Sequence, residues 1–481
     1  MDYYGIIAIA FLVFYLFVGI WAGRKTKTVE DHYVMSRSAP AFLITGTLVA
    51  SNLSSVTFIG FTGTAIKAGP HLMIAMFGMT VIVSLCMGLW VGKYFYRLKL
   101  MTVPDFFRKR YPSKSVQLLA SLIVLISMTV YMVSVMLGST VAAQSLFGWS
   151  PKVSLIAILS IITLFTVIGG MRSVVITDAI MFVIFLLGAL VIGPAIILKL
   201  GGMQMAIEKA TESIPHIFSW HGKMTPFKGF MILLETNVVS LINVAAAPHL
   251  LSRISIAKNE REFGKAMLYL AISMPILIIG LLYTFGYLPA LNSQIEPVNG
   301  FPWVARNLVP AFIGAIGLSG VLAAAISTTT SLFQQASATL SSDLIKTYLK
   351  PDMTNDQLLS LSRWCVVIIA VVVYAGSLTP NISAGSIMYA FLFATACFSA
   401  WLPSLILGVL WKGATTEGAF YSMAVSLPLI IALGIARKTG LVPGWLAPNV
   451  IGLVVSTAIL VIVSKLTQAS HEQELIFENI R

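Results

Sequence analysis

The sequence contains few charged residues. Asp, Glu, Lys and Arg make up only 10% of its 481 residues, whereas 58% are hydrophobic, and the mean hydropathy is +0.91. A soluble domain carries about 25% charged residues. The composition therefore excludes an ordinary soluble protein and predicts an all-α integral membrane protein that crosses the bilayer many times.

Residues for several other chemistries are also missing. The three cysteines all lie inside apolar segments and the six histidines are scattered, which excludes a disulfide framework and a Cys/His metal cluster. No GxxxxGK[ST] loop occurs, so ATP hydrolysis is not an energy source within this chain. The net charge of +13 is better explained by Lys and Arg on the cytoplasmic side of a membrane than by a nucleic-acid partner.

Apolar runs of spanning length predict about 13 membrane helices. The expected spans are 4–23, 41–66, 71–96, 116–146, 152–169, 173–198, 229–251, 266–289, 309–341, 360–378, 384–411, 418–436 and 445–465. Most of the 31 Lys and Arg residues fall in loops that are cytoplasmic if the N-terminus lies outside. The positive-inside rule then predicts an outside N-terminus and a cytoplasmic C-terminus. We expect a multi-pass protein of the plasma (inner) membrane.

Polar residues at bilayer depth are costly, so they are functional candidates. In the second expected helix, residues 50–55 read ASNLSS, and Asn52 is the most costly of them. One interpretation is a packing interface whose hydroxyls bond the carbonyls of their own helix. The other is a discontinuous helix whose unwound carbonyls face a cavity. The residues alone leave both interpretations open.

The seventh expected helix has a second polar cluster, made of Glu235, Thr236, Asn237, Ser240, Asn243, Pro248 and His249. Pro248 cannot donate to the carbonyl of Val244, which favours a break in this helix. Glu235 lies in the outer half, where it can reach outer-loop water or pair with Arg306.

The ninth expected helix contains five consecutive hydroxyl residues, 327–331. The spacing i, i+3, i+4, i+7 defines one helical stripe, which contains Ala324, Ser327, Thr328 and Ser331. Packing hydroxyls need not share a face, but the ligands of one ion must, and hydroxyl and carbonyl oxygens suit a hard cation such as Na+. Thr330 lies beside the stripe, and Thr329 is left over as a hydroxyl that bonds the backbone.

Asp178 is a lone acidic residue at the inner end of the sixth expected helix. It is either a helix-end charge near Arg172 at the cytoplasmic face or a carboxylate ligand of a second cation. Both interpretations remain open at this point.

Taken in order, these motifs resemble the sodium:solute symporter family, whose members transport proline, pantothenate, monocarboxylates, sugars or sialic acid. The resemblance covers almost the whole chain. The matching elements are DHY at 31–33, SRS at 36–38, LVASNLSSVTFIG at 48–60, IGGMRS at 168–173, TD at 177–178, PHLLSR at 248–253, AAAISTTTSLFQQASATLSSDL at 323–344 and LWK at 410–412. Phe165 and Gly413 depart from the residues usual in the family.

The resemblance implies a LeuT-type fold with a 5+5 inverted repeat in a single transporter domain, 1–481. Residues 41–198 and 229–411 would form the two repeats. Residues 1–40 would supply the first helix and an inner loop, and residues 412–481 the C-terminal helices and tail. The two break-prone helices are the first helices of the two halves, as an inverted-repeat transporter requires.

The resemblance also implies the ligands of Na+. The main sodium site would use the backbone carbonyls of Ala50, Leu53 and Ala324 with the hydroxyls of Ser327 and Thr328. A second sodium site, present in some members, would use Asp178, Thr330 and Ser331.

The substrate site would lie between the two broken helices. Its candidate residues are Asn52, Ser54, Thr57, Phe77, Tyr131, Ser240, Asn243, Pro248 and Phe391. No Arg or Lys is expected at mid-span in the second to eleventh helices, so half-helix N-termini and hydroxyls would hold a substrate carboxylate. This argues against the sialic-acid branch and favours a small carboxylate: pantothenate, a monocarboxylate or a neutral amino acid.

The predicted function is sodium-coupled import of a small organic solute by alternating access. The expected partners are Na+, the solute and the lipid bilayer, with no nucleic acid; the oligomeric state is left open, since a monomer can suffice. A proton-coupled permease of the same fold, with Glu235 or Asp178 as the proton carrier, is one alternative. A sodium/sugar symporter is another. An intramembrane enzyme is disfavoured because His249 has no evident acidic partner.

Overall fold

The computed structural model describes residues 3–24, 34–213, 216–221, 224–379 and 381–480. Regular structure within these residues is helical, and their one β-type contact is an isolated bridge between Ala39 and Ala257. The predicted all-α fold class is confirmed. The motif at 31–33 lies outside the described residues.

Eleven helices of the described chain are long and apolar enough to cross a membrane, and a pair bent by 52° brings the number to 12. The pair is Ala41–Asn52 with Val56–Ala68. A shorter apolar helix covers Pro151–Val167, where the sequence predicts the fifth span. The number of 13 spans therefore stays a prediction.

The spans consist of one or more helical segments each. Those of the first part of the chain are α1 (Tyr3–Gly23), α3 (Ala41–Asn52) with η2 (Val56–Phe61) and α4 (Thr62–Ala68), α5 (Pro70–Cys86) with η3 (Met87–Val91) and α6 (Gly92–Arg97), α8 (Lys114–Phe147) and α9 (Pro151–Leu200). Those of the second part are α11 (Pro226–Ala246) with α12 (Pro248–Ser255), α13 (Glu260–Leu277) with η4 (Ile278–Tyr283), α15 (Ala311–Ala338) with η7 (Thr339–Leu349), α16 (Asn355–Ser377), α17 (Ala384–Phe398) with α18 (Leu402–Leu410), α19 (Thr416–Lys438) and α20 (Pro448–Thr467).

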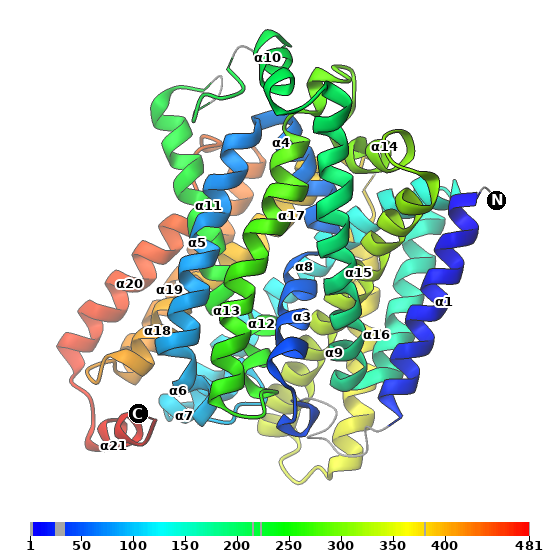
Figure 1. Ribbon diagram of the computed structural model, residues 1–481. Helices are drawn as coiled ribbons and strands as arrows, with labels where there is room; N and C mark the ends of the chain where they lie inside the picture. The colour runs from blue at the N-terminus through cyan, green and yellow to red at the C-terminus, as the bar shows by residue number, and fades with distance from the viewer. Residues whose placement is uncertain (1–2, 25–33, 214–215, 222–223, 380, 481) are drawn as a thin grey trace.

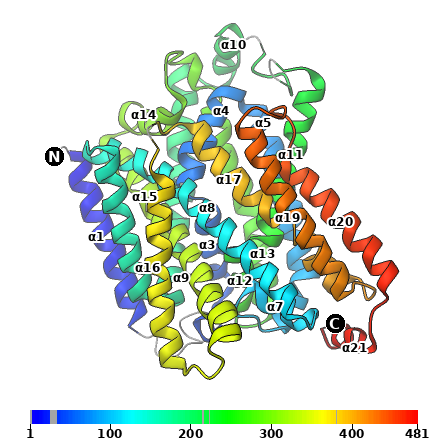
Figure 2. The same cartoon turned by 180° about the vertical axis from the view of Figure 1, so that it is seen from behind.

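Short helices lie at the two ends of the bundle. In Figures 1 and 2, α10 (Met203–Ser213) and α14 (Gly300–Asn307) lie at one end, while α7 (Val103–Arg110) and α21 (His471–Ile480) lie at the other. The start of α1 is near the end that carries α14, so the two termini of the described chain lie at opposite ends of the bundle.

Helix α15 forms the centre of the bundle. It packs against α1, α3, α8, α9 and α16, while α19 and α20 pair with each other on the side away from α1 (Figures 1 and 2). Every residue from Leu318 to Ala338 is buried. The hydroxyl stripe of this helix therefore faces protein on all sides, although a typical amphipathic helix buries only one face.

Glycines allow close contacts where the site is built. A Cβ at Gly46 would lie 2.7 Å from the Cα of Ala179, so this glycine lets α3 touch α9 beside Asp178. A Cβ at Gly138 would lie 3.0 Å from the carbonyl oxygen of Ser55, so α8 can approach the break after α3. Gly170, with φ 71°, bends α9 between the fifth and sixth expected spans.

Candidate functional site

The second span is discontinuous at Leu53, whose backbone is extended (φ −93°, ψ 100°). The N–H of Ser54 donates to Thr57 Oγ1 at 3.3 Å, and the N–H of Val56 donates to Ser54 Oγ at 3.2 Å. In a continuous helix these two N–H groups would bond the carbonyls one turn earlier, including that of Ala50. The broken-helix interpretation of ASNLSS is therefore confirmed, and it directs carbonyl oxygens towards α15.

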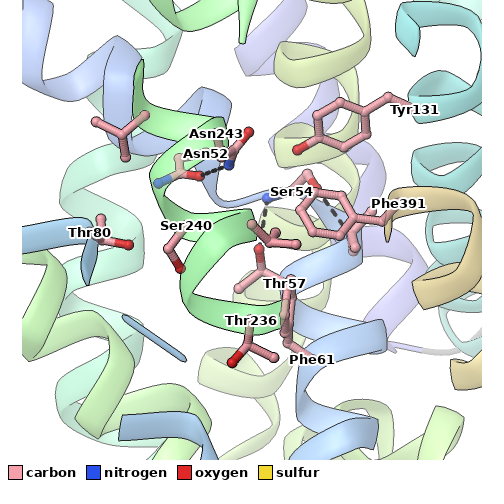
Figure 3. A pocket seen from close by; sticks show the side chains of 13 residues that line it. Asn52, Ser54, Thr57, Phe61, Thr80, Tyr131, Thr236, Ser240, Asn243 and Phe391 are labelled. Atoms are coloured by element: carbon pink, nitrogen blue, oxygen red, sulfur yellow. Dashed lines mark hydrogen bonds between the residues drawn. The ribbon is translucent and has the colours of Figure 1, made fainter. Parts of the chain in front are cut away.

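The seventh span breaks at Ala247, as Pro248 predicts. Ala247 is extended (φ −68°, ψ 121°), and Pro248 is the first residue of α12. The two breaks are joined directly, because Asn243 Nδ2 donates to Asn52 Oδ1 at 2.7 Å (Figure 3). Asn243 Oδ1 is buried and has no donor in the described structure.

A small cavity, of about 20 Å³, lies between the two breaks. It is lined by Asn52, Ser54, Val56, Thr57, Phe61, Thr80, Tyr131, Thr236, Val239, Ser240, Asn243, Val244 and Phe391. Figure 3 shows Asn243 of α11 beside Asn52 at the broken end of α3, with Tyr131 and Phe391 forming an aromatic wall. The ring centroids of that pair are 5.2 Å apart in an edge-to-face arrangement.

Seven of the nine predicted substrate residues line this cavity: Asn52, Ser54, Thr57, Tyr131, Ser240, Asn243 and Phe391. Pro248 is not among the lining residues, because it begins α12 beyond the break. The side chain of Phe77 lies outside those that the structure describes, and Thr80 of the same helix lines the cavity instead. Thr236 also lines the cavity. It belongs to the polar cluster of the seventh span but was not among the predicted substrate residues, although its i, i+4, i+7 spacing with Ser240 and Asn243 was a usable signal.

Two residues of the predicted main sodium site, Thr328 and Ala50, are in direct contact. Thr328 Oγ1 donates to the carbonyl oxygen of Ala50 at 3.3 Å, which joins α15 to the released end of α3. All five predicted ligand residues are buried: Ala50, Leu53, Ala324, Ser327 and Thr328. The donor set consists of hydroxyl and carbonyl oxygens, which fits a hard monovalent cation.

Asp178 lies in the interior and not at the cytoplasmic face. Its side chain is fully buried, Thr47 Oγ1 donates to Oδ2 at 2.5 Å, and Ser327 Oγ donates to Oδ1. The interpretation as a helix-end charge near Arg172 is therefore wrong. The bend at Gly170 brings this part of α9 against α3 and α15.

Arg253 is a functional candidate that lies just beyond the expected seventh span, 229–251. Because the helix restarts at Pro248, α12 continues to Ser255 and carries Arg253 into the interior, where it is fully buried. Its Nη2 donates to Ser331 Oγ at 2.5 Å and to Ser51 Oγ at 3.3 Å. Arg253 lies in the last turn of its span, so the expectation of no Arg or Lys at mid-span stays a prediction, and Arg253 does not line the cavity.

Two further expectations, for Glu235 and Thr329, have clear outcomes, and the structure also gives a contact of Thr330. Glu235 pairs with Arg437 at 2.5 Å and not with Arg306, because the end of α19 lies beside α11. Thr329 Oγ1 is buried without a partner in the described structure, so its expected backbone bond is wrong. Thr330 Oγ1 contacts Thr166 Oγ1 at 3.3 Å.

Comparison with known proteins decides the family. The sequence profile of the "Sodium:solute symporter family" matches residues 32–426, most of the chain. The chain belongs to the sodium:solute symporter family. Sodium-coupled import of a solute is therefore the activity of this symporter, and it is a membrane transporter, not an enzyme.

Curated relatives cover nearly the full length of the symporter. It is 26% identical to the "Osmoregulated proline transporter OpuE" of Bacillus subtilis (strain 168), covering 92% of each chain. It is 25% identical to the "Sodium/pantothenate symporter" of Haemophilus influenzae, covering 88% of this chain and 89% of the relative. It is 23% identical to the "Sodium/glucose cotransporter" of Vibrio parahaemolyticus, covering 86% and 82%.

Solved structures show the same fold. A Na+-coupled sialic acid symporter in a substrate-bound outward-open state aligns with a TM-score of 0.83 at 18% identity, covering 98% of this chain and 99% of that one. A nucleobase-cation-symport-1 family transporter in a closed conformation aligns at 0.57 and 12% identity, covering 95% and 99%. The symporter therefore has the LeuT-type fold that its sequence motifs implied.

Proposed function

We infer that the symporter imports a small carboxylate, such as pantothenate, a monocarboxylate or a neutral amino acid, through the cavity between its two broken helices. The observation that carries this inference is the absence of any charged side chain among the thirteen residues that line the cavity. A solute held there finds amide, hydroxyl and aromatic groups, together with the helical segment that restarts at Val56. The N-terminal end of a helical segment favours a carboxylate.

The main sodium site is proposed at the carbonyls of Ala50, Leu53 and Ala324 and the hydroxyls of Ser327 and Thr328. Its support is the convergence of the broken α3 and the buried stripe of α15. Sodium at this position bridges the two helices and fixes the break at Leu53. Because Ser54 and Thr57 lie just after that break, the same event orders one wall of the cavity.

Coupling then follows from differential stabilisation. Sodium favours the outward-facing form with an ordered cavity, the solute binds the sodium-loaded form more tightly, and alternating access carries both across the membrane. The proposed repeats are 41–198 and 229–411, because each begins with a broken helix. An outside N-terminus and a cytoplasmic C-terminus in the plasma membrane are proposed from the distribution of Lys and Arg.

The test is a thermal-unfolding panel on the purified full-length protein. Small carboxylates, neutral amino acids and sugars are compared in sodium chloride and in choline chloride. The expected result is one carboxylate that stabilises the protein only when sodium is present, by about 2.7 kcal/mol at a hundred times its Kd. Equal stabilisation in choline contradicts sodium coupling at this site. If sugars are the only solutes that stabilise the protein, the substrate is a sugar, and the sodium/sugar symporter alternative is supported.

A further inference from the structure

Two pairs of hydroxyls form a common framework around Asp178 and Arg253. On α3, Thr47 donates to Asp178, while Ser51, one turn later, accepts from Arg253. On α15, Ser327 donates to Asp178, while Ser331, again four residues later, accepts from Arg253. Residues spaced i, i+4 lie on one face of a helix, about 6 Å apart along its axis. The carboxylate and the guanidinium are therefore held by the same two helix faces.

This arrangement leaves little for a second sodium ion to bind. Ser331 Oγ accepts from Arg253 at 2.5 Å and donates to the carbonyl of Ser327 at 3.1 Å. Both carboxylate oxygens of Asp178 already accept a hydrogen bond from a hydroxyl group. A guanidinium that is bonded to one intended ligand also repels a second cation at that position.

The buried carboxylate nevertheless needs a compensating charge. Asp178 is fully buried, and an unpaired charge in the interior is strongly unfavourable. Arg253 is also fully buried, and the two hydroxyls that it bonds lie one helical turn from the two hydroxyls that bond Asp178. Because a guanidinium stays protonated in proteins, Arg253 is able to supply this charge.

We propose that Arg253 is a tethered cation that takes the place of a second sodium ion beside Asp178. The symporter then binds one sodium ion, at the proposed main sodium site on which this inference rests. Unlike a bound ion, Arg253 cannot leave with the solute, so Asp178 keeps its countercharge while the empty carrier returns. Arg253 is thus a positioning residue that holds Asp178, Ser51 and Ser331 and sets the number of ions.

The experiment counts ²²Na+ bound to purified full-length protein at equilibrium. The wild type is expected to bind one ion per chain. Arg253→Ala removes the guanidinium and opens Asp178 and Ser331 to solvent cations, so it is expected to bind two. Arg253→Lys keeps a tethered charge and is expected to bind one. A purely structural role of Arg253 does not predict the gain of an ion.

The outcomes distinguish a failure of the tethered-cation proposal from a failure of the proposed main sodium site. A wild type that binds two ions overturns the tethered cation and leaves the main sodium site intact. A wild type that binds none contradicts the main sodium site. If Arg253→Ala folds and still binds one ion, Arg253 does not take the place of a second sodium ion. If it does not fold, Thr330→Val decides, because loss of an ion or weaker sodium binding in that variant overturns the proposal.

Discussion

Neighbouring hydroxyls on α15 have different partners, although they are chemically alike. Thr328 donates to the carbonyl of Ala50, Ser327 donates to Asp178, and Thr329 has no partner among the described residues. Because α15 is buried on all sides here, each hydroxyl has a fixed environment. The effect of removing one hydroxyl therefore depends on its position on the helix.

Removing a ligand hydroxyl should weaken sodium binding. Ser327→Ala and Thr328→Ala each delete one of the five proposed oxygen ligands. The expected result is at least a tenfold rise in the sodium concentration that gives half-maximal thermal stabilisation, which corresponds to about 1.4 kcal/mol or more. Unfolding midpoints measured across a sodium titration in purified protein supply this number.

The matched control is Thr329→Val, which removes the intervening hydroxyl at nearly constant volume. Since that hydroxyl is buried and unpaired, its loss should leave sodium binding unchanged and keep or raise the unfolding temperature. Wild-type sodium dependence in both ligand variants, or a similar loss in the control, would show that the sodium site lies elsewhere.

At the scale of helices, α11 is held on both sides. Its inner face lines the cavity through Thr236 and Ser240, and its opposite side is fastened to the C-terminal helices. The Glu235 carboxylate accepts from Arg437 of α19 at 2.5 and 2.9 Å, and the Glu235 carbonyl accepts from Asn449 of α20 at 3.1 Å. Helices outside the two proposed repeats therefore position a wall of the substrate cavity.

This ion pair is mostly buried, so breaking it from one side should be costly. Glu235→Leu or Arg437→Met alone is expected to destabilise the protein by about 3–5 kcal/mol, because an unpaired charge remains. The double variant should recover most of that loss. Thermal unfolding of all four proteins gives the coupling energy. Additive losses would contradict the pairing, and the exposed pair Arg97–Glu260 is a control whose removal should have little effect.

Contact between α3 and α9 depends on a missing side chain. Gly46→Ala places a methyl group 2.7 Å from the Cα of Ala179, so it should separate the helices beside Asp178. We expect a destabilisation of about 1–3 kcal/mol from overpacking, together with weaker sodium binding. Gly78→Ala, where a Cβ meets nothing within 4 Å, should be neutral or slightly stabilising. Equal effects of the two changes in thermal unfolding would contradict the close contact.

At the scale of the whole molecule, features with a local cause in the sequence were easier to predict than contacts between distant helices. The two helix breaks were predictable because their causes are local, namely Pro248 and the polar residues of the ASNLSS segment. Arg253 was misplaced because its depth depends on how far α12 continues after the break, which no local signal states. The partner of Glu235 was missed because Arg437 lies 202 residues away in the sequence. The breaks, which have local causes, were found, whereas the surroundings of Arg253 and Glu235, which depend on distant helices, were not.

The joined breaks predict that sodium and solute bind cooperatively. Sodium at the proposed main site would fix the end of α3, where Thr328 bonds the carbonyl of Ala50, and the Asn52–Asn243 bond connects that end to α11. Linkage then requires that sodium raise the affinity for solute by the same factor as solute raises the affinity for sodium, typically about 5- to 150-fold. Two calorimetric titrations with the identified solute measure both factors. Factors that both equal one would mean that the two broken helices do not couple the sites, while Asn243→Leu should reduce both factors together because it removes the connecting bond.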